Sequence, residues 1–310
     1  MGGTRLKLIL AAVLLAANLI LVYEIVTFHY SSAYLPQQSM EHLRHMLAEN
    51  GISVSASAID TRKPDLQIYE GVLGSDYYAR IAETLSGSKM ELYFNAPNGF
   101  VMSMENGARF SFKNGFGIRY AAADAPETAE LAALSEGKLI SLNKADARKL
   151  KRTVDNFLQI VENETGNTQR SLLDYEMLYA GEESESGIRY CICAQKVRGT
   201  EIVGLVSAFA VFENEVIGID GNWCFAQMDT AYSAQLLDQI NILYSVKNRV
   251  LEERAESGED VVEIEALHLG YAAYFRADSD RFYLIPVWNT DMNNGSTYSI
   301  NAVDGSLYTN

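Results

Sequence analysis

The sequence is poor in the residues that build disulfide scaffolds, disordered linkers and metal centres. Its 310 residues include three cysteines, five prolines and four histidines. An exported disulfide scaffold would carry more cysteines, and in an even number. No long tract rich in proline, serine or glycine marks an extended linker. We therefore expect a chain that folds through a hydrophobic core.

The sequence also lacks the short motifs of common enzyme classes. It contains no G-x-S-x-G hydrolase elbow, no H-E-x-x-H zinc motif and no G-x-x-x-x-G-K phosphate loop. His42 and His45, with Glu49 one turn further along, could hold a metal, but a solvated helix surface explains them better. We expect a protein that is not an enzyme, with no catalytic residue, no cofactor and no metal site.

Positive charge is scarce as well. Lys and Arg number 25 against 40 Asp and Glu, which gives a formal net charge of −15 at pH 7. Such a surface repels nucleic acid and anionic lipid headgroups. We expect no nucleic-acid partner, and we interpret the acidic balance mainly as a determinant of solubility.

The cysteines allow more than one interpretation. Cys191 and Cys193 share one face of an expected strand, because side chains alternate along a strand. The favoured interpretation is that they are core thiols acting as small apolar residues. The alternative is a single disulfide bond from either of them to Cys224. A metal site is disfavoured because no histidine lies nearby in the sequence.

A long apolar run begins the chain, with "KLILAAVLLAANLILVYEIV" from Lys7 to Val26. As a helix, the range 8–28 would span about 31 Å, close to the thickness of the bilayer hydrocarbon. A core helix would show a polar stripe, whereas a cleaved signal would end its apolar run before a cut near Ala17. Because the run continues past Ala17, we favour an uncleaved transmembrane anchor over a cleaved export signal.

The charges that flank the anchor predict its orientation. Arg5 and Lys7 precede it, so residues 1–7 should stay in the cytoplasm and the rest of the chain should lie outside the cell. The expected location is the cell membrane, as a single-pass protein. Polar side chains in a membrane helix usually face another helix or a boundary. The predicted helix–helix contact residues are Ala11, Asn18, Val22 and Glu24.

The range 36–142 is predicted to form a small α+β domain. A helix is expected at 39–47, followed by strands at 52–59 and 66–73 and a helix at 76–85. Four strands connected by Asn- and Gly-containing turns follow, in "MELYF", "FVMSM", "ARFSF" and "GIRYAA".

The second half of the chain contains an internal repeat of pattern. Asn143 can cap a helix that reaches about Glu162, and a second helix is expected from Ser233 to about Glu253. Four strand-like stretches follow each helix. The ranges 143–230 and 231–310 are therefore predicted to be two units, each a helix plus a four-stranded antiparallel meander. The predicted fold class is α+β, with a transmembrane helix preceding extracytoplasmic domains.

The carboxy-terminal wording "LGYAAYF", "LIPVWNT" and "YSINAVDGSLY" resembles the YycI/YycH class, and the helix-plus-meander pattern resembles the PepSY module. Members of the YycI/YycH class are bitopic accessory proteins that regulate an essential sensor histidine kinase of Gram-positive bacteria. The residues that carry the resemblance are Gly270, Tyr271, Pro286, Trp288, Tyr298, Asn301, Ala302 and Gly305. The resemblance covers the anchor and about the last 170 residues in pattern, but only about 40 residues in specific wording.

Two functions follow as expectations. The resemblance implies a non-enzymatic, membrane-anchored regulator whose partners are a sensor histidine kinase and a sister accessory membrane protein. The alternative is a PepSY-type extracytoplasmic module that binds peptides or restrains a protease.

Overall fold

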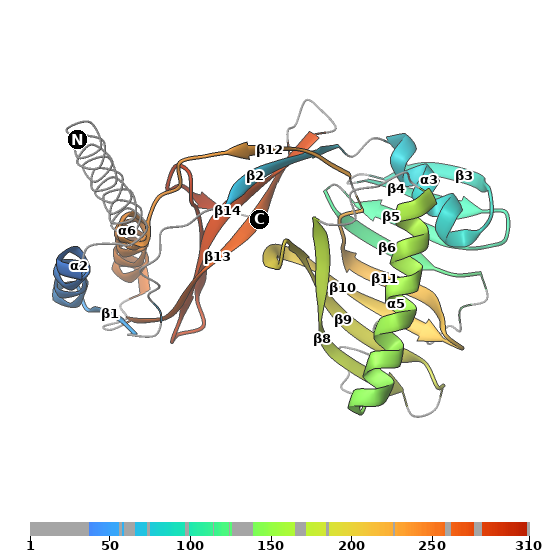
Figure 1. Cartoon of the computed structure of the whole chain (residues 1–310), viewed down its shortest axis with the longest axis horizontal. Coiled ribbons are helices and arrows are strands. Elements are labelled where there is room, and N and C mark those ends of the chain that lie inside the picture. The colour runs from blue at the N-terminus through green and yellow to red at the C-terminus, as the bar shows by residue number, and fades with distance from the viewer. Residues whose placement is uncertain are drawn as a thin grey trace, which may run out of the picture. The chain divides into compact units, whose positions relative to one another are not determined.

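A computed structural model describes most of the chain beyond residue 36 (Figure 1). The described residues are 37–55, 58, 66–72, 75–96, 99–113, 115–123, 125, 139–164, 172–183, 186–225, 227–257, 262–275 and 281–308. Among them, no helix combines the length and the apolar character needed to cross a membrane. The predicted cytoplasmic segment 1–7 and transmembrane helix 8–28 lie outside the described residues.

The described part of the chain is α+β, which confirms the predicted class at that level. Its four helices are α2 (Gln37–Glu49), α3 (Ser75–Ser86), α5 (Lys144–Glu164) and α6 (Gln239–Ser257). Its first strands are β1 (Ile52–Val54), β2 (Gln67–Val72), β3 (Met90–Ala96), β4 (Gly99–Met104), β5 (Arg109–Lys113), β6 (Gly117–Ala121), β7 (Leu139–Ser141) and β8 (Leu173–Glu183). The later strands are β9 (Arg189–Val197), β10 (Thr200–Phe212), β11 (Glu215–Asn222), β12 (Gln227–Ser233), β13 (Val262–Phe275), β14 (Arg281–Met292), β15 (Thr297–Asn301) and β16 (Leu307–Tyr308).

The strands pair in two groups, mostly antiparallel. One group has the order β7-β8-β9-β10-β11-β6-β5-β4-β3, and the other has the order β12-β2-β14-β13. In the second group β1 adds to β13, β15 to β14, and β16 to β15. A single parallel register pair, Ile202 opposite Tyr271, connects β10 to β13.

The first predicted helix-plus-meander unit is present as α5 followed by β8, β9, β10 and β11, each antiparallel to the next. Asn143 caps α5 as expected, since its Oδ1 accepts the backbone N–H groups of Ala145 (2.9 Å) and Asp146 (3.1 Å). The helix lies across one face of the meander (Figure 1). Its apolar residues Leu150, Val154 and Val161 are buried there.

The second predicted helix-plus-meander unit is present as α6 followed by β13, β14, β15 and β16, and these strands neighbour one another in chain order. The predicted helix start at Ser233 is wrong, because α6 begins at Gln239. Residues 227–233 instead form β12 on β2. Asp238 caps the helix, because its Oδ1 accepts the Asn241 N–H at 3.1 Å. The Leu237 N–H donates to the Ala302 carbonyl at 2.6 Å, and this contact holds the backbone before Asp238 outside the helix.

The expected strand at 52–59 is shorter than predicted. Its ladder with β13 covers Ile52–Val54 and ends with the Ser55 N–H, which donates to the Ile264 carbonyl at 3.0 Å, and the Ser55 carbonyl then accepts the Ala58 N–H at 3.1 Å. This local hydrogen bond replaces the next ladder pair. The alternation of "ISVSASAI" therefore did not set the strand's length.

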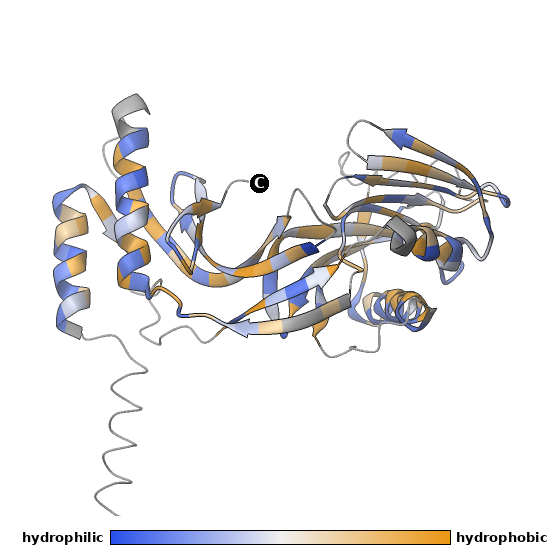
Figure 2. Cartoon of the chain, turned by 90° about the horizontal axis from the view of Figure 1, so that it is seen from above, coloured by the Kyte–Doolittle hydropathy of each residue, from blue (hydrophilic) through white to orange (hydrophobic). Residues whose placement is uncertain are grey.

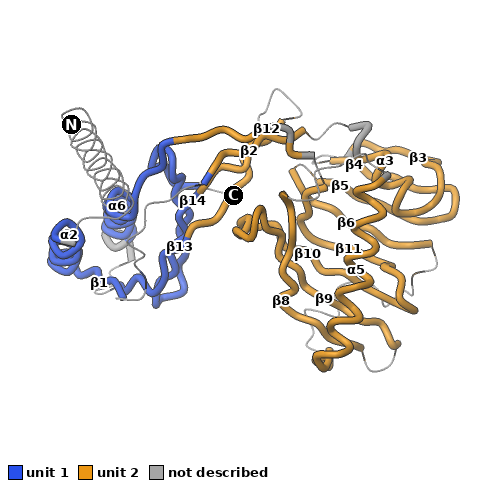
Figure 3. Tube along the Cα trace, in the orientation of Figure 1, with its two compact units in different colours: residues 1–66, 235–268, 287–310 blue, residues 67–234, 269–286 orange. Residues whose placement is uncertain are grey.

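Two compact units are found by packing (Figure 3). Unit 1 comprises residues 1–66, 235–268 and 287–310, and unit 2 comprises 67–234 and 269–286. The predicted domain ranges 36–142, 143–230 and 231–310 stay a prediction. Strand pairing crosses them, since β1 and β2 pair with β13 and β14.

The core of unit 2 lies between the long sheet and the helices α3 and α5. Alternation along β4, β5 and β6 places every second side chain on this covered face, which gathers Met102, Met104, Phe110, Phe112, Ile118 and Tyr120. In unit 1, α2 and α6 carry both apolar and polar residues (Figure 2). Leu43 and Leu47 of α2 and Leu243 and Val246 of α6 are buried.

Candidate functional site

The residues that carry the family resemblance fall into both units. Gly270, Tyr271 and Pro286 belong to unit 2, where all three are buried. The Tyr271 ring lies 5.7 Å from the ring of Tyr69, and burial raises the pKa of Tyr271 above its ordinary value. These three residues pack inside a sheet, so their contacts are structural.

The remaining resemblance residues hold the last hairpin of unit 1. The indole N–H of Trp288 donates to the Leu237 carbonyl at 3.1 Å, just before α6. The Tyr298 hydroxyl donates to Glu253 near the end of the same helix. Trp288 of β14 and Tyr298 of β15 therefore connect these two strands to the start and the end of α6, respectively.

The turn between β15 and β16 accounts for the sequence "NAVDGS". Asn301 Oδ1 accepts the Val303 N–H at 2.8 Å, and the Gly305 N–H donates to the Asn301 carbonyl at 2.9 Å. Gly305 has a φ of +77°, which favours glycine, and Ala302 is fully buried. This stretch specifies a turn and exposes no reactive group in the described residues.

The predicted helix–helix contact residues Ala11, Asn18, Val22 and Glu24 lie outside the described residues. Their role stays a prediction.

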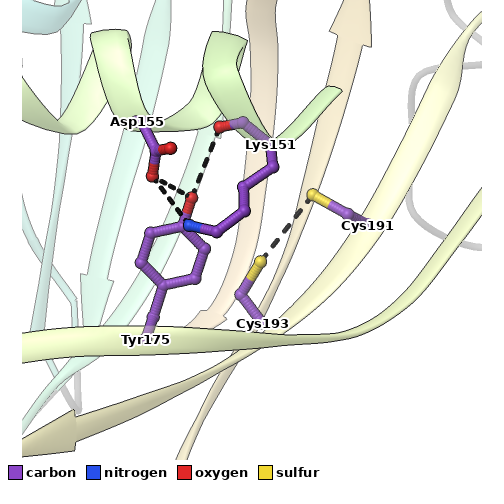
Figure 4. A network of polar contacts seen from close by, with 5 residues as sticks. All are labelled: Lys151, Asp155, Tyr175, Cys191 and Cys193. Atoms are coloured by element: carbon purple, nitrogen blue, oxygen red, sulfur yellow. Dashed lines mark hydrogen bonds and ion pairs between the residues drawn. The ribbon is translucent and has the colours of Figure 1, made fainter. Parts of the chain in front are cut away.

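A polar network lies between α5 and β8 (Figure 4). The Tyr175 hydroxyl donates to Asp155 at 2.5 Å, and Lys151 Nζ lies 3.0 Å from the same carboxylate. The Lys151 ammonium also sits 4.1 Å from the centre of the Tyr175 ring. Burial, followed by the contact with Asp155, raises the pKa of Tyr175 well above its ordinary value. A phenol held neutral in this way is a poor acid or base at neutral pH.

Cys191 and Cys193 lie beside this network, with their sulfur atoms 3.8 Å apart (Figure 4). All three cysteines, Cys191, Cys193 and Cys224, are buried, and none of them forms a disulfide bond. The hydrogen bond with Cys193 and burial raise the pKa of Cys191, which disfavours the reactive thiolate. The structure thus agrees with core thiols and contains no bridge to Cys224.

The backbone of Cys224 is held by the side chain of Gln195. Gln195, itself buried, donates to the Cys224 carbonyl at 2.7 Å and accepts the Cys224 N–H at 2.8 Å. The paired amide satisfies both backbone groups of an irregular segment after β11.

A second charged cluster was not anticipated from the sequence. The carboxylate of Glu70, in the middle of β2, is almost completely buried and accepts hydrogen bonds from Tyr232 (2.6 Å), Tyr283 (3.4 Å) and Arg281. These hydrogen bonds, led by the one from Tyr232, lower the pKa of Glu70. A glutamate inside the apolar stretch "QIYEGV" was the available signal, because a buried charge needs a partner. The two strands on either side of β2 supply those partners, Tyr232 from β12 and both Tyr283 and Arg281 from β14, so the cluster holds β12, β2 and β14 together.

The histidines in the described part of the chain, His42, His45 and His268, form no centre with other metal-ligand residues. His45 Nδ1 lies 3.3 Å from Glu49 on an exposed face of α2, and His268 lies 3.9 Å from Asp291. Within the ranges that the structure describes, no group of three or more His, Cys, Asp and Glu side chains could hold a metal ion.

The long sheet of unit 2 has one face that α3 and α5 leave open. Cross-strand neighbours on this face form a row, which we call the outer row, and all of its side chains are exposed or half-buried. Its members are Phe94, Val101, Ser111, Arg119, Asp220, Ala208 and Ile192.

Charge on the outer row is balanced. Arg119 Nη2 lies 3.0 Å from Asp220 Oδ2, and both residues belong to adjacent strands. The rest of the row is apolar or small. Such a surface offers apolar and small side chains for contact with another protein.

The row ends at β3, where apolar exposure is highest. Met90, Leu92, Tyr93 and Phe94 are 38%, 49%, 44% and 55% exposed, respectively, on one short strand. This edge and the adjoining outer row are the candidate interaction site of the protein.

No protein-family model matches the chain, and no curated protein matches it. The crystal structure of an uncharacterized protein from Eubacterium rectale is similar at a TM-score of 0.43 and 11% sequence identity. The match covers 84% of this chain and 90% of that chain. A likeness at this level carries no argument about function.

Proposed function

We propose that this protein is a non-enzymatic, membrane-anchored regulator of a two-component sensor histidine kinase. The observation that supports it most is that a helix followed by four neighbouring strands occurs twice, in α5 with β8–β11 and in α6 with β13–β16. The residues of the family resemblance from Trp288 onward fasten the second of these modules. The resemblance therefore lies in residues that the fold itself requires.

Regulation of this kind requires that the regulator binds one arrangement of the kinase more tightly than the other, and it requires no catalytic step. The apolar segment 8–28 would dock against the membrane helices of the kinase, and the extracytoplasmic units would contact its sensor domain or a sister accessory protein. Docking that favours one of two kinase arrangements shifts the population by its difference in binding free energy. The clusters around Tyr175 and Glu70 support this picture, since their polar atoms pair within the fold.

The anchor carries the sharpest test. Replacement of Asn18 by leucine keeps the helix insertable, because leucine is favoured in hydrocarbon. Loss of one interhelical hydrogen bond should weaken association by about 0.6–2 kcal/mol, or roughly three- to thirty-fold. The measurement is a membrane two-hybrid assay between the anchor and the helices of a histidine kinase that co-purifies with the full chain.

A shifted amide provides the matched control. The double variant Asn18→Leu/Leu19→Asn restores the polar group on a different helix face and should not restore the signal. Equal signals from the wild type and both variants would mean that the anchor is only a tether. Recovery of the full chain without any kinase, under crosslinking that captures established membrane complexes, would contradict the proposal as a whole.

The alternative is a PepSY-type extracytoplasmic module that binds a peptide or restrains a protease. The open sheet face favours it, because the outer row presents small and apolar side chains with one internally balanced ion pair. This function needs only the extracytoplasmic part. A fragment that begins near Leu35 should retain binding or inhibition under this alternative and lose most function under the regulator proposal.

A further inference from the structure

Two buried thiols and a thioether lie on the face of the long sheet that α5 covers. The Sγ atoms of Cys191 and Cys193 on β9 are 3.8 Å apart, and both residues belong to the core of unit 2 (Figure 4). Met177 lies directly opposite Cys193 on the neighbouring strand β8 and packs against the same core. Directly opposite residues have Cβ atoms about 4.5–5.5 Å apart, a distance that the long, flexible side chain of methionine spans. Three sulfur atoms can therefore converge on one point.

The separation of the two thiols suits a shared metal ion. An ion about 2.3 Å from each of two thiolates, with a bond angle of about 110–120°, holds the sulfur atoms about 3.8–4.0 Å apart. The observed 3.8 Å lies in this range. A disulfide bond would need the same atoms at about 2 Å, and alternate residues of a strand have Cα atoms about 6.6 Å apart, near the upper limit for such a bond. The pair is thus better placed to share an ion than to form a disulfide bond.

The available ligands select a soft ion. Thiolate and thioether sulfur favour Cu(I), whereas structural zinc takes four ligands from cysteine, histidine and carboxylate side chains. Within the described ranges no group of three or more His, Cys, Asp and Glu side chains could hold a metal ion, so Cys224 adds no third thiolate to the pair. The thioether of Met177 is the third ligand at hand, and it suits Cu(I).

The charges around the pair are compatible with a metal thiolate. Two thiolates with one Cu(I) leave one net negative charge, and Lys151 of α5 lies close by (Figure 4). The hydrogen bond from Cys193 and burial raise the pKa of Cys191, whereas the positive charge of Lys151 acts in the opposite direction. A cysteine thiol without a bound metal is mostly protonated at pH 7. Binding of one ion by the pair should therefore release two protons.

An unsatisfied hydroxyl on the other side of Cys193 fits the same site. Ser207 of β10 lies directly opposite Cys193, is buried, and its Oγ has no hydrogen-bond partner in the described chain. Burial of a hydroxyl without a partner is costly, so its presence calls for an explanation. A thiolate accepts a hydrogen bond better than a thiol does, and rotation of the Ser207 side chain toward a metal-bound Cys193 would satisfy the hydroxyl.

We propose that this protein binds one Cu(I) ion between the thiolates of Cys191 and Cys193 and the thioether of Met177. In the metal-bound form, the Ser207 hydroxyl donates a hydrogen bond to the Cys193 sulfur. Met177 is half-buried, so the ion reaches the buried thiols by way of this side chain. The inference is independent of the proposed function, because it uses neither the anchor nor a kinase.

Competition with a chelator tests the site in the intact protein. The full chain, reduced and kept in detergent micelles without oxygen, is titrated with Cu(I) against bicinchoninate, which is a coloured chelator of this ion. We expect one Cu(I) per chain and two protons released per ion at pH 7, measured with an indicator dye in weak buffer. Failure to withhold copper from the chelator, or binding without proton release, would overturn the proposal.

Matched variants assign the ligands. Cys191→Ala/Cys193→Ala should lose the ion, whereas Cys224→Ala, which removes the other buried thiol, should bind it like the wild type. Met177→Leu conserves apolar volume and should lower the affinity at least about tenfold, because even outer-shell partners of a metal contribute about 10–100-fold. Circular dichroism melts show that each variant folds. Copper retained by the double cysteine variant would be adventitious and would overturn the site, as would equal affinities of Met177→Leu and the wild type.

Ser207→Ala distinguishes a metal site from simple packing. Removal of an unpaired buried hydroxyl should raise the melting temperature of the metal-free protein. The same change should lower the affinity for Cu(I) about tenfold, because the metal thiolate loses its hydrogen-bond donor. Thermal melts without copper and the chelator competition measure the two effects. A Cu(I) affinity equal to that of the wild type would overturn the role of Ser207 in the site.

Discussion

At the residue scale, the polar side chains of this protein are used to fasten its elements. Tyr175 connects β8 to Asp155 of α5, and Trp288 connects β14 to the backbone before α6. Glu70 has the most demanding position, because its nearly buried carboxylate depends on two tyrosines and an arginine for compensation. Each contact joins residues that the sequence keeps far apart.

Glu70 should make the stability of the protein depend on pH. Its pKa in the folded protein is lowered, so its stabilising contribution is fully present above the ordinary glutamate pKa of about 4.3 and is lost as the pH falls through the folded value. We expect Glu70→Gln to lower the melting temperature at pH 7. The difference from wild type should shrink as the pH falls below about 4.

Thermal melts of both proteins from pH 7 to pH 3 check this expectation. Glu176→Gln is the control, because its carboxylate pairs with Lys196 on an exposed surface where such pairs contribute little. A Glu70→Gln difference that stays constant over the whole pH range would contradict the role of the ionised carboxylate.

At the element scale, the hairpin of β3 and β4 depends on one close approach. Gly99 has a φ of +150°, and a Cβ at this position would lie 1.9 Å from the carbonyl oxygen of Phe112 on β5. Gly87, just after α3, has a φ of +62° with no atom within 4 Å of the added carbon. Both positions have a backbone conformation that favours glycine, but only at Gly99 would an added Cβ also clash with a neighbouring strand.

The two alanine variants should therefore separate clearly. Gly87→Ala should cost about 1–2 kcal/mol of unfolding free energy, which is the penalty for a left-handed alanine. Gly99→Ala should cost about 3 kcal/mol or more, because backbone atoms of β5 must move. Urea unfolding followed by far-UV circular dichroism measures both values, and equal costs would contradict the close packing of β4 on β5.

At the scale of the whole molecule, two strands belong to both compact units. β13 passes from unit 1 to unit 2 between His268 and Leu269, and β14 passes back between Pro286 and Val287. A strand cannot lose its ladder in one unit without fraying toward the other. The two tryptophans report on this coupling, because Trp288 belongs to unit 1 and Trp223 to unit 2.

We expect the two units to unfold in one transition. In Trp223→Phe the remaining fluorescence reports unit 1, and in Trp288→Phe it reports unit 2. Within each variant, the fluorescence midpoint in urea should coincide with the midpoint of far-UV circular dichroism, as two-state unfolding requires. Two separate transitions in either variant would show that the shared strands do not couple the units.

The sequence by itself determined most helices and strands, and their order. The alternation of apolar residues predicted β3 to β6, β8 to β11 and β13 to β16, and the capping side chain of Asn143 predicted where α5 begins. These signals are local, because they depend on residues within a few positions of one another. They also sufficed for the repeated helix-plus-meander pattern.

Only the tertiary structure decided which distant segments pair. Glu70 and Arg281 are 211 residues apart, and neither carries a local mark of the other. The start of α6 follows from the Leu237 contact with Ala302, and β12 exists because β2 offers it an edge. The exposed edge of β3 is likewise a property of the complete strand order. Long-range pairing depends on which loops close and which surfaces fit together. The periodicity of one segment gives no information about either.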